Sequence, residues 1–236
     1  MKKTLLLVSI LSFIVSCTPD LVLNNDLKEK TEVMQVKGKQ GFRIKQVISY
    51  GEFETSKVKR SWTTSYNIPL IVTFKGAKQK LSYLQVDGKR NVAEVFGASV
   101  YSEKEIGWLS EYFKIQLDYK SYYTGTIALD KGTNNWDYII FNPNTAHWNN
   151  VTRGFARNGS EEIEIKGVKK LKGQASFMNL DVYGYEFIKN GRSIGAVSIV
   201  NNGRVWMRTD LDDETRLVLA SLSSGLMLRD NIEEEQ

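Results

Sequence analysis

The chain has 236 residues, a formal net charge of +5 and one cysteine, Cys17. That length suits one large β domain or two small ones, and a single cysteine excludes an intramolecular disulfide. No long basic run alternates with aromatic residues, so we expect no nucleic-acid partner. The sequence also lacks a phosphate-binding glycine loop, a dinucleotide fingerprint and a Cys/His metal set, and we therefore expect no cofactor and no metal.

The N-terminus has the pattern of an export signal. Lys2 and Lys3 form a short basic region, and residues 5–15 form an uninterrupted run that is mostly apolar. This run is shorter than the about 20 apolar residues that a helix needs to span a bilayer. A basic start followed by a short apolar run is typical of a secretory signal peptide.

The end of this run, Ile14-Val15-Ser16-Cys17, resembles the lipobox of bacterial lipoproteins. The resemblance implies a signal peptide over residues 1–16, lipidation of Cys17 and a membrane partner through that lipid. It also implies the bacterial cell envelope as location. Because Thr18 does not match an inner-membrane retention signal of the aspartate type, we expect the outer membrane. An ordinary secretory signal that happens to contain a cysteine is the alternative.

Residues 17–38 are polar and show no sustained period, which predicts a flexible tether after the lipidated cysteine. From residue 39 to residue 230 we expect a single β-barrel-like domain, followed by an acidic tail over residues 231–236. Alternating stretches such as FRIKQVISY indicate strands, and three dipeptides indicate tight hairpin turns: Asp87-Gly88, Asn190-Gly191 and Asn202-Gly203.

One helix is expected between the strands. SEKEIGWLSEYF places Ile106, Leu109 and Phe113 at helical spacing, although Gly107 weakens the pattern.

A second helix is predicted at about residues 211–229. Asp210 can cap it, and the acidic residues 212–214 fill a first turn in which the helix dipole favours carboxylates. Residues 217–228 carry no charge on any side. Such a helix is buried on all sides or lies in a membrane, and its about 18 Å is too short to cross a bilayer. We therefore expect a mainly β fold, an antiparallel β-barrel closed around this hydrophobic C-terminal helix.

Residues 185–228 combine a hairpin, a glycine-bearing strand, the strand end VWMRTDLD and this helix. That order resembles the tubby C-terminal fold, which is shared with phospholipid scramblases and LURP-one-related proteins. The resemblance implies a closed barrel threaded by a C-terminal helix. The basic residues that bind lipid in tubby cannot be mapped onto this chain, so that activity is not carried over. A lipocalin-like barrel is disfavoured because it packs an amphipathic helix on the outside.

Two motifs resemble catalytic or metal sites. Residues 191–195 match the G-x-S-x-G pattern, but Ser193 follows a hairpin turn rather than preceding a helix, and the only histidine, His147, lies upstream. Residues 210–214, DLDDE, resemble a calcium loop but lack its glycine and distal glutamate. We interpret the first as a hairpin strand and the second as the start of a helix, and we assign no catalytic residue.

Two stretches are candidates for binding. Trp136, Tyr138, His147 and Trp148 lie among asparagines, and an exposed face of this kind would suit a sugar or a peptide. The alternative is that Trp136 and Tyr138 share a core-facing strand side. Residues 166–173, KGVKKLKG, form a basic run that could meet anionic headgroups near the anchor, or simply a solvated turn.

The sequence thus predicts a lipid-anchored cell-envelope protein with a non-catalytic binding or scaffolding domain. Its partner would be an unidentified ligand or envelope protein. Two alternatives stay open: a lipid-handling protein of the tubby or scramblase type, and a hydrolase that uses carboxylates.

Overall fold

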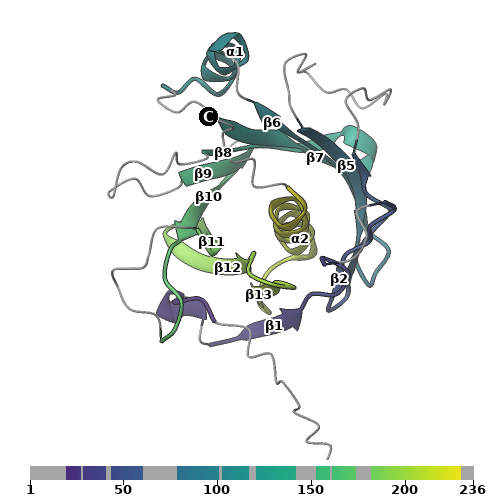
Figure 1. Cartoon of the computed structure of the whole chain (residues 1–236), viewed down its shortest axis with the longest axis vertical. Helices are drawn as coiled ribbons and strands as arrows, with labels where there is room; N and C mark the ends of the chain where they lie inside the picture. Colours follow the sequence, from purple (N-terminus) through teal and green to yellow (C-terminus); the bar gives the residue numbers. More distant parts are fainter. Residues whose placement is uncertain are drawn as a thin grey trace, which may run out of the picture.

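A computed structural model describes residues 20–27, 29–40, 44–60, 79–100, 103–116, 121–141, 153–159, 161–173 and 182–229. In this part of the chain, thirteen antiparallel strands form one sheet that curves around a central helix (Figure 1). Along the sheet the strand order is β1-β13-β12-β11-β10-β9-β8-β7-β6-β5-β3-β2, and β4 pairs with β5 beside this path. The prediction of a mainly β antiparallel barrel is confirmed.

The strands are β1 (Thr31–Gln35), β2 (Ser49–Tyr50), β3 (Phe53–Thr55), β4 (Lys59–Arg60), β5 (Gln79–Val86), β6 (Val92–Val100), β7 (Tyr122–Leu129), β8 (Asn134–Phe141), β9 (Arg153–Asn158), β10 (Glu161–Val168), β11 (Gly184–Lys189), β12 (Arg192–Ser198) and β13 (Arg204–Arg208). The α-helices are α1 (Glu103–Phe113) and α2 (Asp213–Leu228), and short 3-10 turns lie at Asn25–Leu27 and Asp130–Gly132.

The two ends of the sheet, β1 and β2, come together and nearly close the barrel. Just beyond β1, the Lys37 amide donates to the Ser49 carbonyl at 2.9 Å, and the Ser49 amide donates back to the Lys37 carbonyl at 3.2 Å. Close by in the sequence, Lys39 Nζ donates to the carbonyls of Ile199 at 2.5 Å and Asn201 at 2.8 Å, and burial lowers the pKa of this amine. These contacts join the end of β1 to the neighbouring elements.

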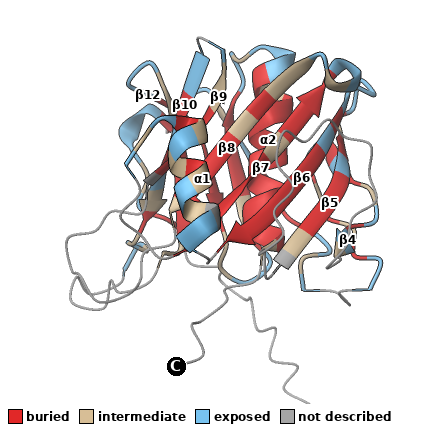
Figure 2. Cartoon of the chain, turned by 90° about the horizontal axis from the view of Figure 1, so that it is seen from above, coloured by how far each residue is buried: buried red, intermediate tan, exposed pale blue. Residues whose placement is uncertain are grey.

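Helix α2 occupies the centre of the barrel. All its residues from Leu217 to Leu228 are buried, and the side view shows the buried helix behind the strands (Figure 2). The prediction that this uncharged helix is buried inside the barrel is therefore confirmed. The helix begins at Asp213, and its cap is Asp212, whose carboxylate accepts from the Thr215 amide at 2.7 Å. The expected cap, Asp210, is instead held in a two-bond pair with Arg208.

Five buried tyrosines line the interior around α2: Tyr50, Tyr83, Tyr123, Tyr138 and Tyr185. Burial raises the pKa of each of these phenols, and that of Tyr123 to about 12. Two of them bind the helix backbone directly. Tyr50 donates to the Ala220 carbonyl at 2.7 Å, and Tyr83 donates to the Ser221 carbonyl at 2.6 Å.

Helix α1 packs on the outer wall. Its Leu109 and Phe113 are buried together with Ile139 and Phe155 on β8 and β9, and the other side of the helix faces solvent (Figure 2). The helical spacing that we recognised in this segment is thus confirmed. Because residues alternate across a strand, β8 contributes to both sides of the barrel wall.

One of the three predicted hairpin turns has the backbone conformation that its two residues favour, and a second has it at one of its two residues. Asn190 and Gly191 both have positive φ, at 54° and 75°, as a two-residue hairpin requires. In the next turn, positive φ falls on Asn201 and on Gly203, so the predicted Asn-Gly pair is only half correct.

The turn between β5 and β6 is built differently. Its positive φ lies at Arg90 and not at Asp87 or Gly88. The Asp87 carboxylate organises the longer loop by accepting from the amides of Lys89 at 2.9 Å and Asn91 at 2.8 Å. Aspartate side chains commonly bind the backbone two residues ahead, which explains why this turn is longer than a tight hairpin.

The segment expected to be a flexible tether belongs largely to the folded domain. Strand β1 pairs with β13 over its full length, and Leu21 and Leu27 are buried against the outer wall. The expectation for residues 17–38 is therefore wrong from Asp20 onward. Strand β1 points only one apolar side chain, Met34, into the core, so its sequence shows little periodicity.

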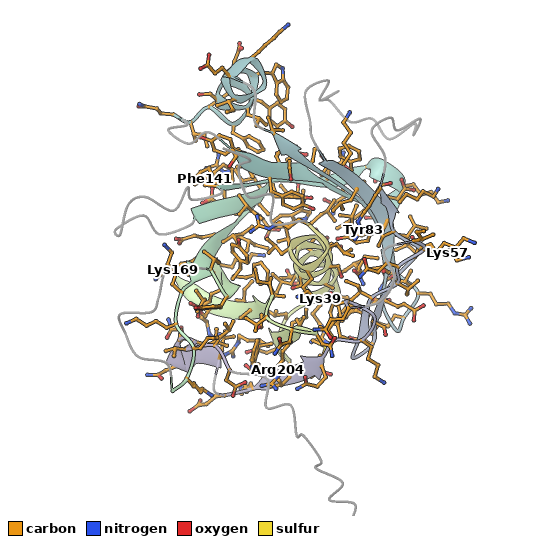
Figure 3. The ribbon with its side chains drawn as sticks, in the orientation of Figure 1. Lys39, Lys57, Tyr83, Phe141, Lys169 and Arg204 are labelled. Carbon is orange, nitrogen blue, oxygen red and sulfur yellow. The ribbon has the colours of Figure 1, made fainter. Side chains whose placement is uncertain are left out.

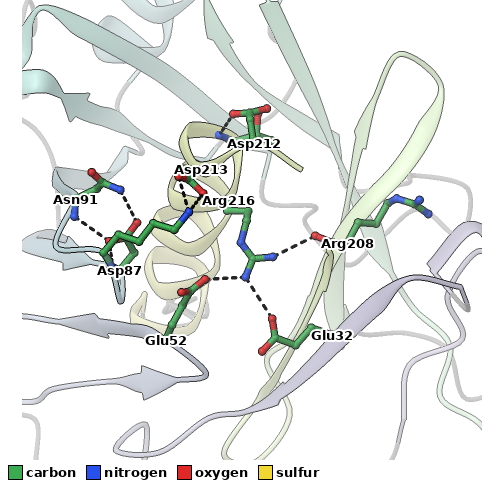
Figure 4. Close-up of polar contacts among 10 residues, drawn as sticks. Glu32, Glu52, Asp87, Asn91, Arg208, Asp212, Asp213 and Arg216 are labelled. Carbon is green, nitrogen blue, oxygen red and sulfur yellow. Dashed lines mark hydrogen bonds and ion pairs between the residues drawn. The ribbon is translucent and has the colours of Figure 1, made fainter. Parts of the chain in front are cut away.

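The Arg216 guanidinium on α2 strengthens the region where the barrel closes (Figure 4). Its Nη2 pairs with Glu52 Oε1 at 2.8 Å and Glu32 Oε2 at 3.2 Å, and its Nη1 donates to the Arg208 carbonyl at 3.2 Å. The side chain is 13% exposed, so it is largely shielded from solvent. One residue thereby links the helix to β1, to β13 and to the turn before β3.

Candidate functional site

Two of the four residues predicted to form an exposed binding face, Trp136 and Tyr138, do not lie on the surface. Trp136 and Tyr138 are buried inside the barrel, where Trp136 Nε1 donates to Glu214 Oε1 at 3.2 Å and Tyr138 donates to the Phe96 carbonyl at 3.0 Å. Their positions agree with the alternative interpretation, in which both side chains lie on the core-facing side of β8. His147 and Trp148 lie outside the described residues.

Ser193 of the G-x-S-x-G motif is part of the packed wall. It lies on β12 and is buried, and its Oγ donates to Glu186 Oε1 at 2.5 Å. The same carboxylate oxygen accepts from the Asn24 amide at 3.2 Å. The serine therefore lies on a strand beneath the N-terminal segment, which is the hairpin-strand interpretation and not a nucleophile elbow.

The acidic residues before α2 have structural partners. Asp213 pairs with Lys89 at 2.7 Å, while the bond from Arg208 lowers the pKa of Asp210. Burial acts to raise the pKa of Asp212, but the hydrogen bonds from Thr215 outweigh it and lower that pKa. Within the described residues, no group of three or more His, Cys, Asp or Glu side chains could hold a metal ion.

The strongest candidate site lies on the outer wall, where the N-terminal segment meets β10 and β13. Leu21 and Leu27 pack there against Val168, Ala196 and Trp206 in a small core of their own. This cluster fixes the chain to the barrel from Leu21 onward. Its residues come from the N-terminal segment and from strands far away in the sequence, which is why sequence reasoning missed it.

The first residue that the structure describes is Asp20, which we call the entry aspartate. Its carboxylate pairs with the Arg204 guanidinium and, at 3.1 Å, with Lys172 Nζ. Its carbonyl accepts from the Lys172 amide at 2.8 Å, and two residues later the Val22 amide donates to the Lys170 carbonyl at 3.0 Å. The residues from Asp20 to Val22 are thus hydrogen-bonded to the basic run that begins at the end of β10.

That basic run, residues 166–173, is here called the lysine turn. It contains four lysines and no acidic residue. Lys166, Lys170 and Lys172 are exposed, and Leu171 forms a β-bridge with Leu21. In Figure 3, Lys169 of this turn and Lys57 lie on opposite sides of the barrel. The turn therefore gives one side of the molecule a concentration of positive charge beside the first fixed residues of the domain.

Chemically, this arrangement can attract anions but offers no nucleophile with an activating base. In the part of the chain that the structure describes, neither α-helix is long and apolar enough to cross a bilayer. No protein-family model, curated protein or solved structure matches the chain.

Proposed function

We propose that this chain is a lipid-anchored bacterial cell-envelope protein whose barrel acts as a non-catalytic binding or scaffolding domain. One observation carries the proposal. The entry aspartate, Asp20, and the buried Leu21 fix the domain only three residues after Cys17. Lipidation of that cysteine would therefore place the barrel directly at a membrane surface, most simply that of the outer membrane.

A binding role is supported by how the interior is used. Helix α2 and the tyrosines around it form one continuous hydrophobic core, so ligands would meet the outer wall and the loops. A hydrolase based on carboxylates needs an acid whose pKa is raised. The two carboxylic acids with a resolved pKa shift among the described residues, Asp210 and Asp212, are shifted downward.

The lipid-handling alternative of the tubby type has one point in its favour, the barrel built around a C-terminal helix. Since α2 fills the centre, a lipid would have to bind on the outer surface. That alternative would therefore rely on the same side of the molecule as the anchor.

The anchor is tested with Cys17→Ala in the full chain. We expect the native protein to sediment with membranes and its N-terminal peptide to carry the mass of acyl chains, and the variant to lose both properties. Thr18→Ala, which keeps the cysteine, is the matched control and should stay membrane-bound. An unmodified native N-terminus, or a Cys17→Ala variant that still sediments with membranes, would refute the assignment.

A further inference from the structure

We propose that the lysine turn rests on the anionic headgroups of the anchoring membrane and thereby holds the barrel in one orientation. The proposal builds on the lipidation of Cys17 and goes beyond it. It names a second membrane contact, made by described residues of the domain itself, and it identifies which side of the barrel faces the lipid. A lipid anchor alone would leave the domain free to rotate.

The first step is distance. Three residues of fully extended chain span at most about 10 Å, so a lipid on Cys17 keeps Asp20 within that distance of the acylated residue. Asp20 is fixed by Arg204 and by both the amide and the amine of Lys172. Electrostatic interactions at physiological salt decay over about 8 Å, a length similar to that of this tether, so the lysine turn can come within range of the headgroups.

The second step is charge. Lys170 and Lys172 are exposed, and the side chain of Lys172 remains 67% exposed even while it pairs with Asp20. Asp20 itself is shared with Arg204, so its negative charge is already compensated. Clusters of lysines next to a membrane attachment point bind anionic lipids, and each contributes to the affinity.

The third step is an apolar residue in the same place. Val22 is 47% exposed, and its amide is bonded to the Lys170 carbonyl. Apolar side chains beside basic ones are the composition that binds at a membrane interface, where the apolar group enters the headgroup boundary. Val22 and the exposed lysines thus form a small mixed surface next to the attachment point.

The test uses the acylated full-length protein, purified in detergent and inserted from outside into preformed vesicles of phosphatidylethanolamine and phosphatidylglycerol. A water-soluble amine-acylating reagent then labels the lysines, and peptide mass spectrometry gives a rate for each. One lysine near an anionic surface gains about 1 kcal/mol of binding free energy, which corresponds to a factor of about five. We therefore expect labelling of Lys170 and Lys172 to be slower by about fivefold or more in the vesicles than in detergent. Lys57, on the opposite side, should keep its rate. High salt should reduce the protection.

Two variants serve as a matched pair. In the double variant Lys170→Gln/Lys172→Gln, the neighbouring Lys166 should lose its protection from labelling in the vesicles. In Lys57→Gln, the protection of Lys166 should remain. The mass of the N-terminal peptide reports acylation in the same experiment. An acylated protein whose Lys170 and Lys172 react in anionic vesicles as fast as in detergent would overturn the orientation and leave the anchor standing. A protein without acyl chains would overturn the anchor itself.

Discussion

The five tyrosines inside the barrel predict that alkaline pH unfolds the protein cooperatively. Each phenol is buried, and burial favours its neutral, protonated form, so its pKa in the folded state lies above the ordinary value of 10.0. Below pH 10 the phenols are protonated in both states, and their contribution to stability is fully present. As pH rises above 10, the unfolded chain loses these protons first, and stability falls.

The size of the effect follows from the pKa shifts. For Tyr123 the window runs from 10.0 to about 12. Within such a window, each buried tyrosine lowers the free energy of unfolding by about 1.4 kcal/mol per pH unit. Tyr123 alone therefore removes about 1.4 kcal/mol by about pH 11, and the other four buried phenols act in the same direction. Domains of this kind have stabilities of about 5–15 kcal/mol, so we expect unfolding at strongly alkaline pH, above the ordinary tyrosine pKa of 10.0.

A rapid jump to strongly alkaline pH tests this reasoning. Phenolate absorbance from the five buried tyrosines should rise at the rate at which far-ultraviolet circular dichroism is lost. Tyr83→Phe removes one of the five groups, and the fall of stability above pH 10 should become shallower. If all the absorbance appeared at once while the circular dichroism stayed native, the tyrosines would not be buried around α2.

Two substitutions test the packing. Leu222 is 3% exposed, and Leu222→Asp should abolish cooperative thermal unfolding because an unpaired carboxylate in the core costs at least about 4 kcal/mol. The control Leu222→Met should cost less than about 1.5 kcal/mol. A native melting temperature in the aspartate variant would show that the helix is exposed. Arg216→Ala should lower the urea-derived unfolding free energy by about 1–2 kcal/mol, since it removes three hydrogen bonds of a side chain that is only 13% exposed. Lys89→Ala, which breaks an exposed pair with Asp213, should cost about 0.5 kcal/mol or less. Equal losses in the two variants would mean that Arg216 does not strengthen the closure.

The parts of the fold that could be predicted have a local signature. A helix formed by the uncharged run 217–228 has no charged side to turn toward water, so it requires burial on all sides. Its place at the barrel centre follows from that requirement. Strand alternation and the Asn190-Gly191 turn are also local properties of the chain. By contrast, β1 depends on hydrogen bonds from β13, more than 160 residues away in the sequence, and its own five residues do not reveal them.

The candidate site, too, could be predicted from the sequence only in part. The lysine turn is visible in the sequence as a basic run, but its significance depends on Asp20, whose partners Arg204 and Lys172 lie more than 150 residues away. The aromatic pair Trp136 and Tyr138 illustrates the opposite case. Composition alone suits either an exposed face or a core, and only the closure of the sheet around α2 decides that both point inward.

The contacts of the central helix also explain why the interior of the barrel serves packing. Apolar packing alone would let a helix without a polar side rotate about its axis, but directional bonds from Tyr50 and Tyr83 to the carbonyls of Ala220 and Ser221 define one rotation. Small residues make this possible. A Cβ at Gly225 would lie 3.3 Å from the Tyr83 hydroxyl oxygen, so a larger residue there would crowd the bond. Because α2 and the tyrosines around it fill the interior, the binding role that we propose would use the outer wall, where the entry aspartate and the lysine turn lie.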